Sequence, residues 1–446
     1  MVTPDMTPSI TESADESTRA GNYFVSNYPP YSVWNAGHVA DALAHFERPP
    51  ATMSPLGLYV HIPFCRKRCH FCYFKVYTDK NANEIEGYID SLLEELTIYA
   101  SKPFIGGRKP TFIYIGGGTP SYLSTKQLSR LVTEMKRLMP WDNVQEAAFE
   151  CEPGTITEGK LEVIRDLGFT RLSLGIENFN DEILKTNGRA HLSKEIERAY
   201  TTARAVGFPQ INIDLISGMI GETDENWREA VRKTVEMSPD SVTIYQMEVP
   251  YNTTIFHDMK VIGESVAPVA SWKTKREWVG YAFSEFEKAG YTVGSAYTAV
   301  KDPSRTKFLY RDLLWAGADM VGLGVASFSH VQGTHFQNEH DFATYQARLK
   351  RGELPLYRAL TPLHDERMIR EFVLQLKLGS LRQKYFEEKF GFDPSEHFAP
   401  QLEALTRQGL ATVEPDRIRL SREGLLRVDS LLPEFFKPEH RLARRV

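Results

Sequence analysis

The stretch HIPFCRKRCHFC, residues 61–72, carries three of the four cysteines of the chain, Cys65, Cys69 and Cys72. It overlaps the end of the β-rich run LGLYVHI at residues 56–62, so the cysteines come directly after a predicted strand. Cysteines grouped this closely in a long chain indicate a metal or redox centre rather than a disulfide framework.

The spacing of these cysteines distinguishes two kinds of metal centre. A structural zinc ion takes four ligands, and the fourth candidate, His70, lies inside the ligand loop, where reaching the same ion is awkward. An iron–sulfur cluster instead binds each iron through one cysteine thiolate. Three thiolates on a four-iron cluster leave one iron open to bind a substrate or cofactor and to deliver one electron to it. The spacing therefore favours a [4Fe-4S] cluster over zinc.

The composition excludes several classes of protein. The 446 residues include 53 Lys and Arg against 58 Asp and Glu, a net charge of −5, so we expect no nucleic-acid partner. A hydrophobic content of 42% is enough to fill a sizeable core. No apolar run reaches the roughly 18 residues of a membrane helix, and the N-terminus lacks the pattern of a secretory signal. We expect a cytoplasmic protein with at most peripheral membrane contact, for which the basic end HRLARR at residues 440–445 is one candidate.

An alternation of strands and helices begins at residue 56. Strand-like runs recur between amphipathic helical segments, and they read LGLYVHI, TFIYI, EAAFECE, TRLSLGI, QINIDLI and SVTIYQMEV. About six β–α units in succession predict an α/β fold with a parallel sheet, a partial (β/α)6 barrel. In such folds ligands bind at the C-terminal ends of the strands, so we expect the functional residues there.

The chain divides into four predicted parts. Residues 1–20 are predicted to be a disordered tail, 21–50 an aromatic N-terminal arm, 51–330 the barrel, and 331–446 a mostly helical, winged-helix-like C-terminal domain with one hairpin. Adjacent prolines prevent regular structure in the arm. Two interpretations of the arm stay open, a strap packed on a domain surface and a lid over an active site.

Polar residues stand at several predicted strand ends. The glycines of GGGTP, residues 116–120, allow a backbone to approach a ligand closely. In the stretch FECEP, Glu150 and Glu152 share one face of a strand and Cys151 lies on the other, which favours a buried apolar role for the cysteine. Asp214 lies inside the apolar run INIDLI. A buried acid costs several kcal/mol unless it is paired, so we expect a partner or a cationic ligand such as a sulfonium.

Together the cysteine motif and the glycine loop resemble the radical S-adenosylmethionine (radical SAM) superfamily. More narrowly, the ordered motifs resemble the oxygen-independent coproporphyrinogen III oxidase family, well over residues 58 to about 330 and loosely beyond; they read YVHIPFC, GGGTPSYL, RLSLGIENF, NIDLISG and GLGVASFSH. The resemblance implies that Cys65, Cys69 and Cys72 bind a [4Fe-4S] cluster. It also implies that SAM chelates the open iron and is cleaved reductively to a 5′-deoxyadenosyl radical.

The resemblance further implies two SAM molecules and the side chains that bind them, but no catalytic residue of the protein itself. Phe71 matches an aromatic that packs against the adenine. The residues implied for the first SAM are Tyr59, Gly117, Glu150 and Phe328. The residues implied for the second SAM are Gly118, Thr119, Glu177, Arg189, Asp214 and Met247.

Departures from the family patterns leave three activities open, which are those of the oxidase, the haem chaperone and a third branch of the superfamily. Phe74 stands where the oxidases usually have a further cysteine, and Glu177 where they usually have glutamine. Residues 309–324 lack the His-Asn pair usual in the related haem chaperones, for which His61, His70 and His330 would be axial-ligand candidates.

A third branch with this scaffold comprises the class C radical SAM methyltransferases. They need no cysteine beyond the cluster ligands, whereas the two-cysteine type needs two more and only Cys151 remains. We therefore expect a class C methyltransferase that uses two SAM molecules to methylate an sp² carbon of a flat conjugated substrate, such as menaquinone at C8. The oxidase and the haem chaperone are the alternatives. The expected partners are a quinone or porphyrin-like substrate and a one-electron donor such as flavodoxin or ferredoxin.

Overall fold

A single mixed sheet of twelve strands forms the centre of the computed structural model, which describes residues 16–441 and residue 443. The strand order is β12-β11-β10-β9-β1-β2-β3-β4-β5-β6-β8-β7. Seven neighbouring strands of this sheet are parallel, and they are β9 (Asp319–Leu323), β1 (Leu56–Ile62), β2 (Phe112–Gly117), β3 (Glu146–Cys151), β4 (Arg171–Glu177), β5 (Gln210–Ser217) and β6 (Ser241–Gln246). The predicted partial barrel is confirmed.

Antiparallel strands extend both edges of this parallel core. They are β7 (Thr292–Val293), β8 (Thr298–Val300), β10 (Phe328–Val331), β11 (Thr334–Asn338) and β12 (Leu356–Leu360). The boundary predicted after residue 330 therefore falls inside the sheet, which ends only at residue 360. The strand β11, THFQN, is buried but rich in polar residues, so it lacks the apolar signal that marks a buried strand.

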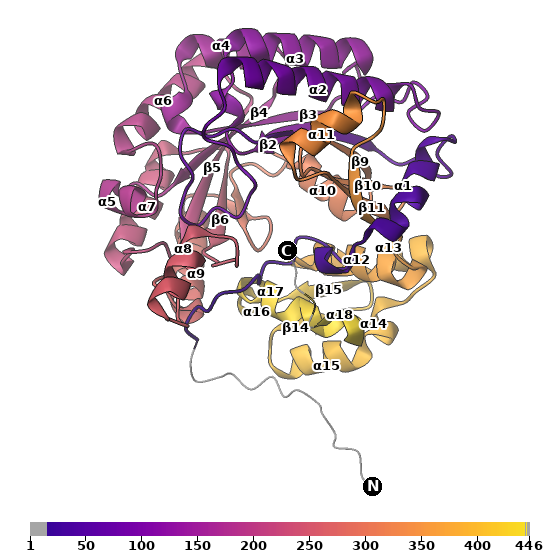
Figure 1. Ribbon diagram of the computed structural model, residues 1–446. Helices are drawn as coiled ribbons and strands as arrows, with labels where there is room; N and C mark the ends of the chain where they lie inside the picture. Colours follow the sequence, from indigo (N-terminus) through magenta and orange to yellow (C-terminus); the bar gives the residue numbers. More distant parts are fainter. Residues whose placement is uncertain (1–15, 442, 444–446) are drawn as a thin grey trace.

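Helices connect the parallel strands from β1 to β6 and cover the outside of the curved sheet, as Figure 1 shows. They are α2 (Ala82–Ala100), α3 (Thr125–Leu138), α4 (Glu158–Asp166), α5 (Asp181–Thr186), α6 (Ser193–Val206) and α7 (Asp224–Met237). Of the later helices, α8 (Thr254–Ile262) and α9 (Trp272–Lys288) follow β6, α10 (Leu309–Trp315) precedes β9 and packs on β2 and on α12 (His364–Leu376), and α11 (Phe342–Leu349) lies between β11 and β12. Local sequence sets several of their starts. Asn81 and Glu84 form a capping box at α2, and Ser124 and Gln127 form another at α3.

The C-terminal domain contains a three-stranded sheet with helices around it. Its elements are α12 (His364–Leu376), β13 (Ser380–Arg382), α13 (Gln383–Phe390), α14 (Pro394–His397), α15 (Ala399–Arg407), β14 (Ala411–Val413), β15 (Arg417–Leu420), α16 (Arg422–Leu426), α17 (Val428–Leu431) and α18 (Pro438–Arg441). The strand order is β13-β15-β14, with β14 and β15 forming the predicted hairpin. This arrangement agrees with the predicted winged-helix-like domain.

The N-terminal segment runs between the barrel and the C-terminal domain (Figure 1). Residues 1–15 of the predicted disordered tail lie outside the described residues, while Thr18 is already buried against the barrel. Val25 and Tyr28 are buried in the core of the C-terminal domain, and helix α1 (Val39–Phe46) packs on the sheet edge. The segment therefore fastens the two parts of the molecule to each other.

A buried carboxyl group joins helix α2 to the loop that follows β9. The side chain of Glu95 is 0% exposed and accepts hydrogen bonds from Gly324 N (2.8 Å), Asn338 Nδ2 (2.6 Å) and Tyr345 Oη (2.7 Å). Burial raises the pKa of Glu95 to about 7. An unfolded glutamate titrates near about 4.3, so the folded state holds this proton more tightly. The free energy of unfolding should therefore fall as the pH rises from about 4.5 through about 7.

The variant Glu95→Gln tests this pH dependence, because its amide does not ionise and therefore costs no stability as the pH rises. Relative to the wild type, its free energy of unfolding should rise by about 3 kcal/mol between pH 4.5 and pH 8. Urea unfolding at a series of pH values measures the difference, and Glu94→Gln, at the exposed neighbouring position, is the matched control. Parallel pH profiles for Glu95→Gln and the wild type would contradict the prediction.

Candidate active site

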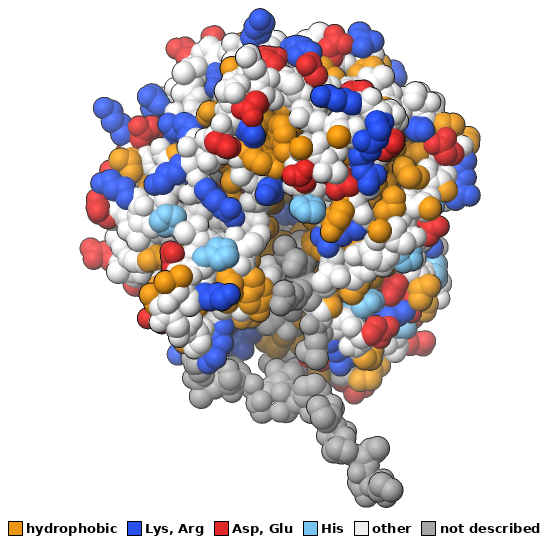
Figure 2. Space-filling model, in the orientation of Figure 1, with side chains coloured by type: hydrophobic (Ala, Val, Ile, Leu, Met, Phe, Trp, Pro, Cys, Tyr) orange, Lys and Arg blue, Asp and Glu red, His pale blue; other side chains and the backbone are white. Residues whose placement is uncertain are grey.

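A cavity of about 890 Å³ lies at the carboxyl ends of the parallel strands. Its wall combines the cysteine loop after β1, the glycine loop after β2 and the ends of β3 to β6 with the N-terminal arm and residues 425–430 of the C-terminal domain. Figure 2 shows the surface hollowed near the middle of this face. The cavity thus gathers most of the residues that the sequence places at strand ends.

All three motif cysteines line the cavity. Thr119 Oγ1 donates to Cys65 Sγ at 3.3 Å, and Arg189 Nη1 donates to Cys69 Sγ at 3.3 Å. Burial raises the pKa of the Cys65 thiol to about 11 and that of the Cys72 thiol to about 12. These thiols therefore require a strong positive centre, such as iron, to become thiolates.

The arrangement of the thiols fits an iron–sulfur cluster. Within residues 16–441, no group of three His, Cys, Asp or Glu side chains is placed to hold one metal ion. An iron–sulfur cluster does not need three side chains around one ion, because each thiolate binds a different iron. A Cβ atom at Gly118 would lie only 3.0 Å from Cys65 Sγ, so a glycine keeps the space beside this sulfur free.

Gly117 has a backbone conformation that other residues rarely adopt, with φ of +113°. A Cβ atom there would come within 2.6 Å of the His61 ring. The amide N of Gly117 donates to Glu150 Oε2 at 3.0 Å, and Tyr114 Oη donates to Glu150 Oε1 at 2.6 Å. Burial raises the pKa of Glu150 to about 7. The glycine loop and the end of β3 thus present one polar group beside the cysteines.

A second polar group lies at the ends of β4 and β5. Glu177 has a φ of +67°, which is unusual for a residue other than glycine, and its carboxylate lies 3.6 Å from the Arg189 guanidinium. Burial raises the pKa of Glu177 to about 7. Asp214 accepts from Ser173 Oγ at 2.8 Å and from Asn212 Nδ2 at 2.9 Å, and burial raises its pKa as well. Asp214 forms no ion pair with another described residue, so a cationic ligand would stabilise its charged form.

Apolar side chains complete the wall. Phe71 and Met247 line the cavity and pack in one apolar cluster, and Phe328 lies 4.4 Å from the ring of Tyr31 on the arm, centroid to centroid. Tyr59 lies behind this surface, with its Oη 3.0 Å from His61 Nδ1, and does not line the cavity.

The arm lines the cavity and is fastened to the barrel. Tyr23, Phe24 and Tyr31 line the cavity. The backbone N–H groups of Tyr23 and Phe24 donate to the carboxylate of Glu248 on the barrel. These contacts agree with a strap, while a lid over an active site stays a prediction.

A buried lysine of the C-terminal domain fixes the next residue of the arm. Val25 N donates to Asp429 Oδ1 at 2.8 Å, while Lys377 Nζ donates to Val25 O at 2.5 Å and lies 3.1 Å from Asp429 Oδ1. Sequence reasoning missed Lys377, Asp429 and Glu248. The available signal was the charge of Lys377 within the apolar helical stretch FVLQLKLG, the same kind of signal that identified Asp214.

Cys151, His330 and His70 are the remaining candidates from the sequence, and each packs against other parts of the protein. Cys151 is 4% exposed, and burial raises the pKa of its thiol far above the usual range. His330 is buried and its Nδ1 lies 2.9 Å from Ala318 O. His70 lies against Gly188, where a Cβ atom would approach its ring to 2.8 Å.

In the described part of the chain, no helix is long and apolar enough to cross a membrane.

Comparisons with known proteins agree with the motifs. Residues 59–234 match the radical SAM superfamily, and residues 362–427 match the HemN C-terminal domain. The chain is 28% identical to the oxygen-independent coproporphyrinogen III oxidase of Salmonella typhimurium, over 84% of each chain. It is 29% identical to the enzyme of that name from Helicobacter pylori, over 85% of this chain and 86% of the relative. It is 27% identical to the haem chaperone HemW of Bacillus subtilis, over 82% of this chain and 96% of the relative.

The fold is that of a solved relative. The structure of coproporphyrinogen III oxidase (HemN) from Escherichia coli superimposes with a TM-score of 0.79 and 24% sequence identity, over 94% of this chain and 99% of that one. The radical SAM match confirms the predicted [4Fe-4S] cluster and SAM. The expectation of a class C methyltransferase, with menaquinone as an example of its substrate, is not supported, because these relatives are named as oxidases and a chaperone.

Proposed function

We propose that this chain, whose residues 59–234 match the radical SAM superfamily and 362–427 the HemN C-terminal domain, oxidatively decarboxylates a propionate side chain of a porphyrinogen-type tetrapyrrole. The observation that carries the proposal is the cavity of about 890 Å³, which the three thiols, both polar groups and the aromatic arm line together. With SAM, the cluster supplies a one-electron cleavage that generates a radical able to take a hydrogen atom from carbon. The proposal replaces methyl transfer as the favoured activity.

The reaction needs little acid–base catalysis by the protein. One hydrogen atom of the side-chain carbon next to the ring would pass to the radical derived from SAM and end in 5′-deoxyadenosine. Carbon dioxide would then leave from the carboxylate and one electron would pass to an acceptor, so that a vinyl group remains. The protein must therefore orient the substrate and exclude water. Tyr23, Phe24 and Tyr31 supply flat apolar surface for a macrocycle.

Basic side chains of the cysteine loop support a substrate with several carboxylates. Lys67 and Arg68 are exposed on this loop and line the cavity, whereas Arg66 and Arg276 line it already paired with Glu152 and Glu16. Guanidinium groups bind carboxylates through two parallel hydrogen bonds. The same exposed loop brings the cluster close to the surface, where a one-electron donor such as flavodoxin or ferredoxin would reach it.

An isotopic assay tests the proposal. Anaerobically reconstituted protein is given a reductant, coproporphyrinogen III and SAM with a deuterated methyl group, and the products are read by mass. We expect decarboxylated tetrapyrrole together with undeuterated 5′-deoxyadenosine and no S-adenosylhomocysteine. Deuterated 5′-deoxyadenosine with S-adenosylhomocysteine would show methyl transfer instead. Tight haem binding without either product would favour the chaperone.

A further inference from the structure

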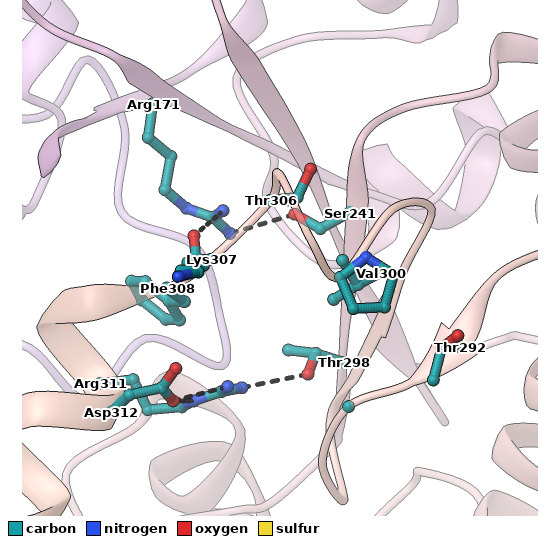
Figure 3. Close-up of a pocket in the computed structure, with 12 residues that line it drawn as sticks. Arg171, Ser241, Thr292, Thr298, Val300, Thr306, Lys307, Phe308, Arg311 and Asp312 are labelled. Atoms are coloured by element: carbon teal, nitrogen blue, oxygen red, sulfur yellow. Dashed lines mark hydrogen bonds and ion pairs between the residues drawn. The ribbon is translucent and has the colours of Figure 1, made fainter.

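A second cavity, of about 300 Å³, lies at the opposite edge of the sheet, and we call it the amino-end cavity. It forms where β4 and β6 begin, at Arg171 and Ser241, and the segment that leads into helix α10 closes it (Figure 3). Its volume is at the lower end of the range of small-molecule sites, about 300–1,000 Å³. The proposed activity uses none of its residues.

Arg171 is a buried cation whose hydrogen bonds all go to neutral acceptors. The residue is 2% exposed, and its guanidinium donates to Gln210 Oε1 (3.2 Å), Lys307 O (3.3 Å) and Ser241 Oγ (3.1 Å). None of these acceptors is charged, and no described carboxylate forms an ion pair with Arg171. The carboxyl groups of Glu146 and Asp214 are near enough for Arg171 to lower their pKa values, which burial raises. Neither carboxyl group contacts the guanidinium directly, so its hydrogen-bond partners carry no charge.

A second guanidinium enters the same cavity. Arg311 Nη1 donates to Thr298 Oγ1 at 3.0 Å and to Ser295 Oγ at 3.2 Å, and its Nε donates to Asp312 Oδ1 at 2.8 Å. Figure 3 shows Arg171 and Arg311 reaching in from the same side toward the hydroxyl groups of Ser241 and Thr298.

The charges of the lining side chains do not balance. Arg171, Lys307 and Arg311 are cationic, and Asp312 is the carboxylate that lines the cavity with them. The ring of Phe308 lies between the two guanidinium groups, 4.6 Å from that of Arg171 and 5.6 Å from that of Arg311, and separates them from each other. Hydroxyl donors line the space as well, from Ser241, Thr292, Thr298 and Thr306.

We propose that the amino-end cavity binds a small anion with several ionised oxygens, a phosphate or a small dicarboxylate. Guanidinium groups match the oxygens of both kinds of anion, and the hydroxyl groups supply further donors. Such an anion supplies a charged acceptor, which Arg171 lacks among its hydrogen-bond partners. The inference stands independently of the reaction at the other end of the barrel.

Isothermal titration calorimetry on the anaerobically reconstituted protein tests this site. Inorganic phosphate is titrated at constant ionic strength, and malonate is titrated in a second series. We expect saturable binding of at least one anion. The anion that binds more tightly shows whether the site prefers a phosphate or a small dicarboxylate. Arg311→Gln and Lys307→Gln should each weaken that binding by about 10-fold or more.

Arg305→Gln is the matched control, because Arg305 lies in the same segment but is exposed and does not line the cavity. It should bind the anion like the wild type. The absence of saturable binding for both anions would overturn the proposal. So would binding that Arg311→Gln and Lys307→Gln leave unchanged, because the anion would then occupy another place.

Discussion

Replacement of Cys69 by alanine should abolish both the iron–sulfur absorbance and the cleavage of SAM. Cys69 is one of three thiols that line the cavity, and its sulfur lies 3.3 Å from Arg189 Nη1. With two thiolates left, the cluster loses the ligand of one iron. Visible absorbance after anaerobic reconstitution and the yield of 5′-deoxyadenosine should both fall to background.

Cys151→Ala is the matched control for this experiment. The Cys151 side chain is buried in the main apolar core, so its loss leaves only a small void there. Absorbance and SAM cleavage should be retained. Full cluster absorbance in Cys69→Ala would contradict the assignment of the cluster ligands, and loss of turnover in Cys151→Ala with an intact cluster would show that this thiol takes part in the reaction.

Asp214→Asn should separate SAM cleavage from product formation. Asp214 is a half-buried carboxylate held by the neutral donors of Ser173 and Asn212, an arrangement that suits a cationic ligand such as the second SAM. The amide keeps the shape but loses the charge. Loss of one preorganised electrostatic contact typically costs about 100-fold in rate. We expect a loss of that order in product formation, while cluster absorbance and uncoupled formation of 5′-deoxyadenosine persist.

Equilibrium dialysis supplies the second measurement for Asp214→Asn. Two SAM molecules per chain are expected for the wild type and one for the variant. Asp224→Asn is the matched control, because Asp224 is exposed at the start of helix α7 and pairs with Arg228 on the surface. Wild-type turnover and stoichiometry in Asp214→Asn would remove this carboxylate from the SAM sites.

The local parts of the fold and the site were predictable from the sequence. The strand before Cys65 and the glycines after the next predicted strand are local signals, and a parallel sheet brings its carboxyl ends together whatever the details of packing. Asp214 was recognisable because a carboxylate inside an apolar run demands an explanation.

Parts that depend on long-range contacts were not predictable in this way. Lys377 and Val25 are 352 positions apart, and nothing near either residue indicates that they meet. The strand β11 is defined by its pairing with β10 and β12 rather than by its own polar sequence. The amino-end cavity was not predictable either, since Arg171 and Arg311 are 140 positions apart in the chain, and the motif RLSLGIENF that begins at Arg171 indicates a strand and not a cavity.

A line of hydrogen bonds joins the two ends of the barrel. Arg171 Nη2 donates to Ser241 Oγ (3.1 Å), Ser241 Oγ donates to Asn212 Oδ1 (2.8 Å), and Asn212 Nδ2 donates to Asp214 Oδ1 (2.9 Å). By thermodynamic linkage, any factor by which SAM at Asp214 changes the affinity for an anion at Arg171 equals the factor by which that anion changes the affinity for SAM. Saturation curves for one ligand at fixed levels of the other would therefore return the same coupling free energy from either end.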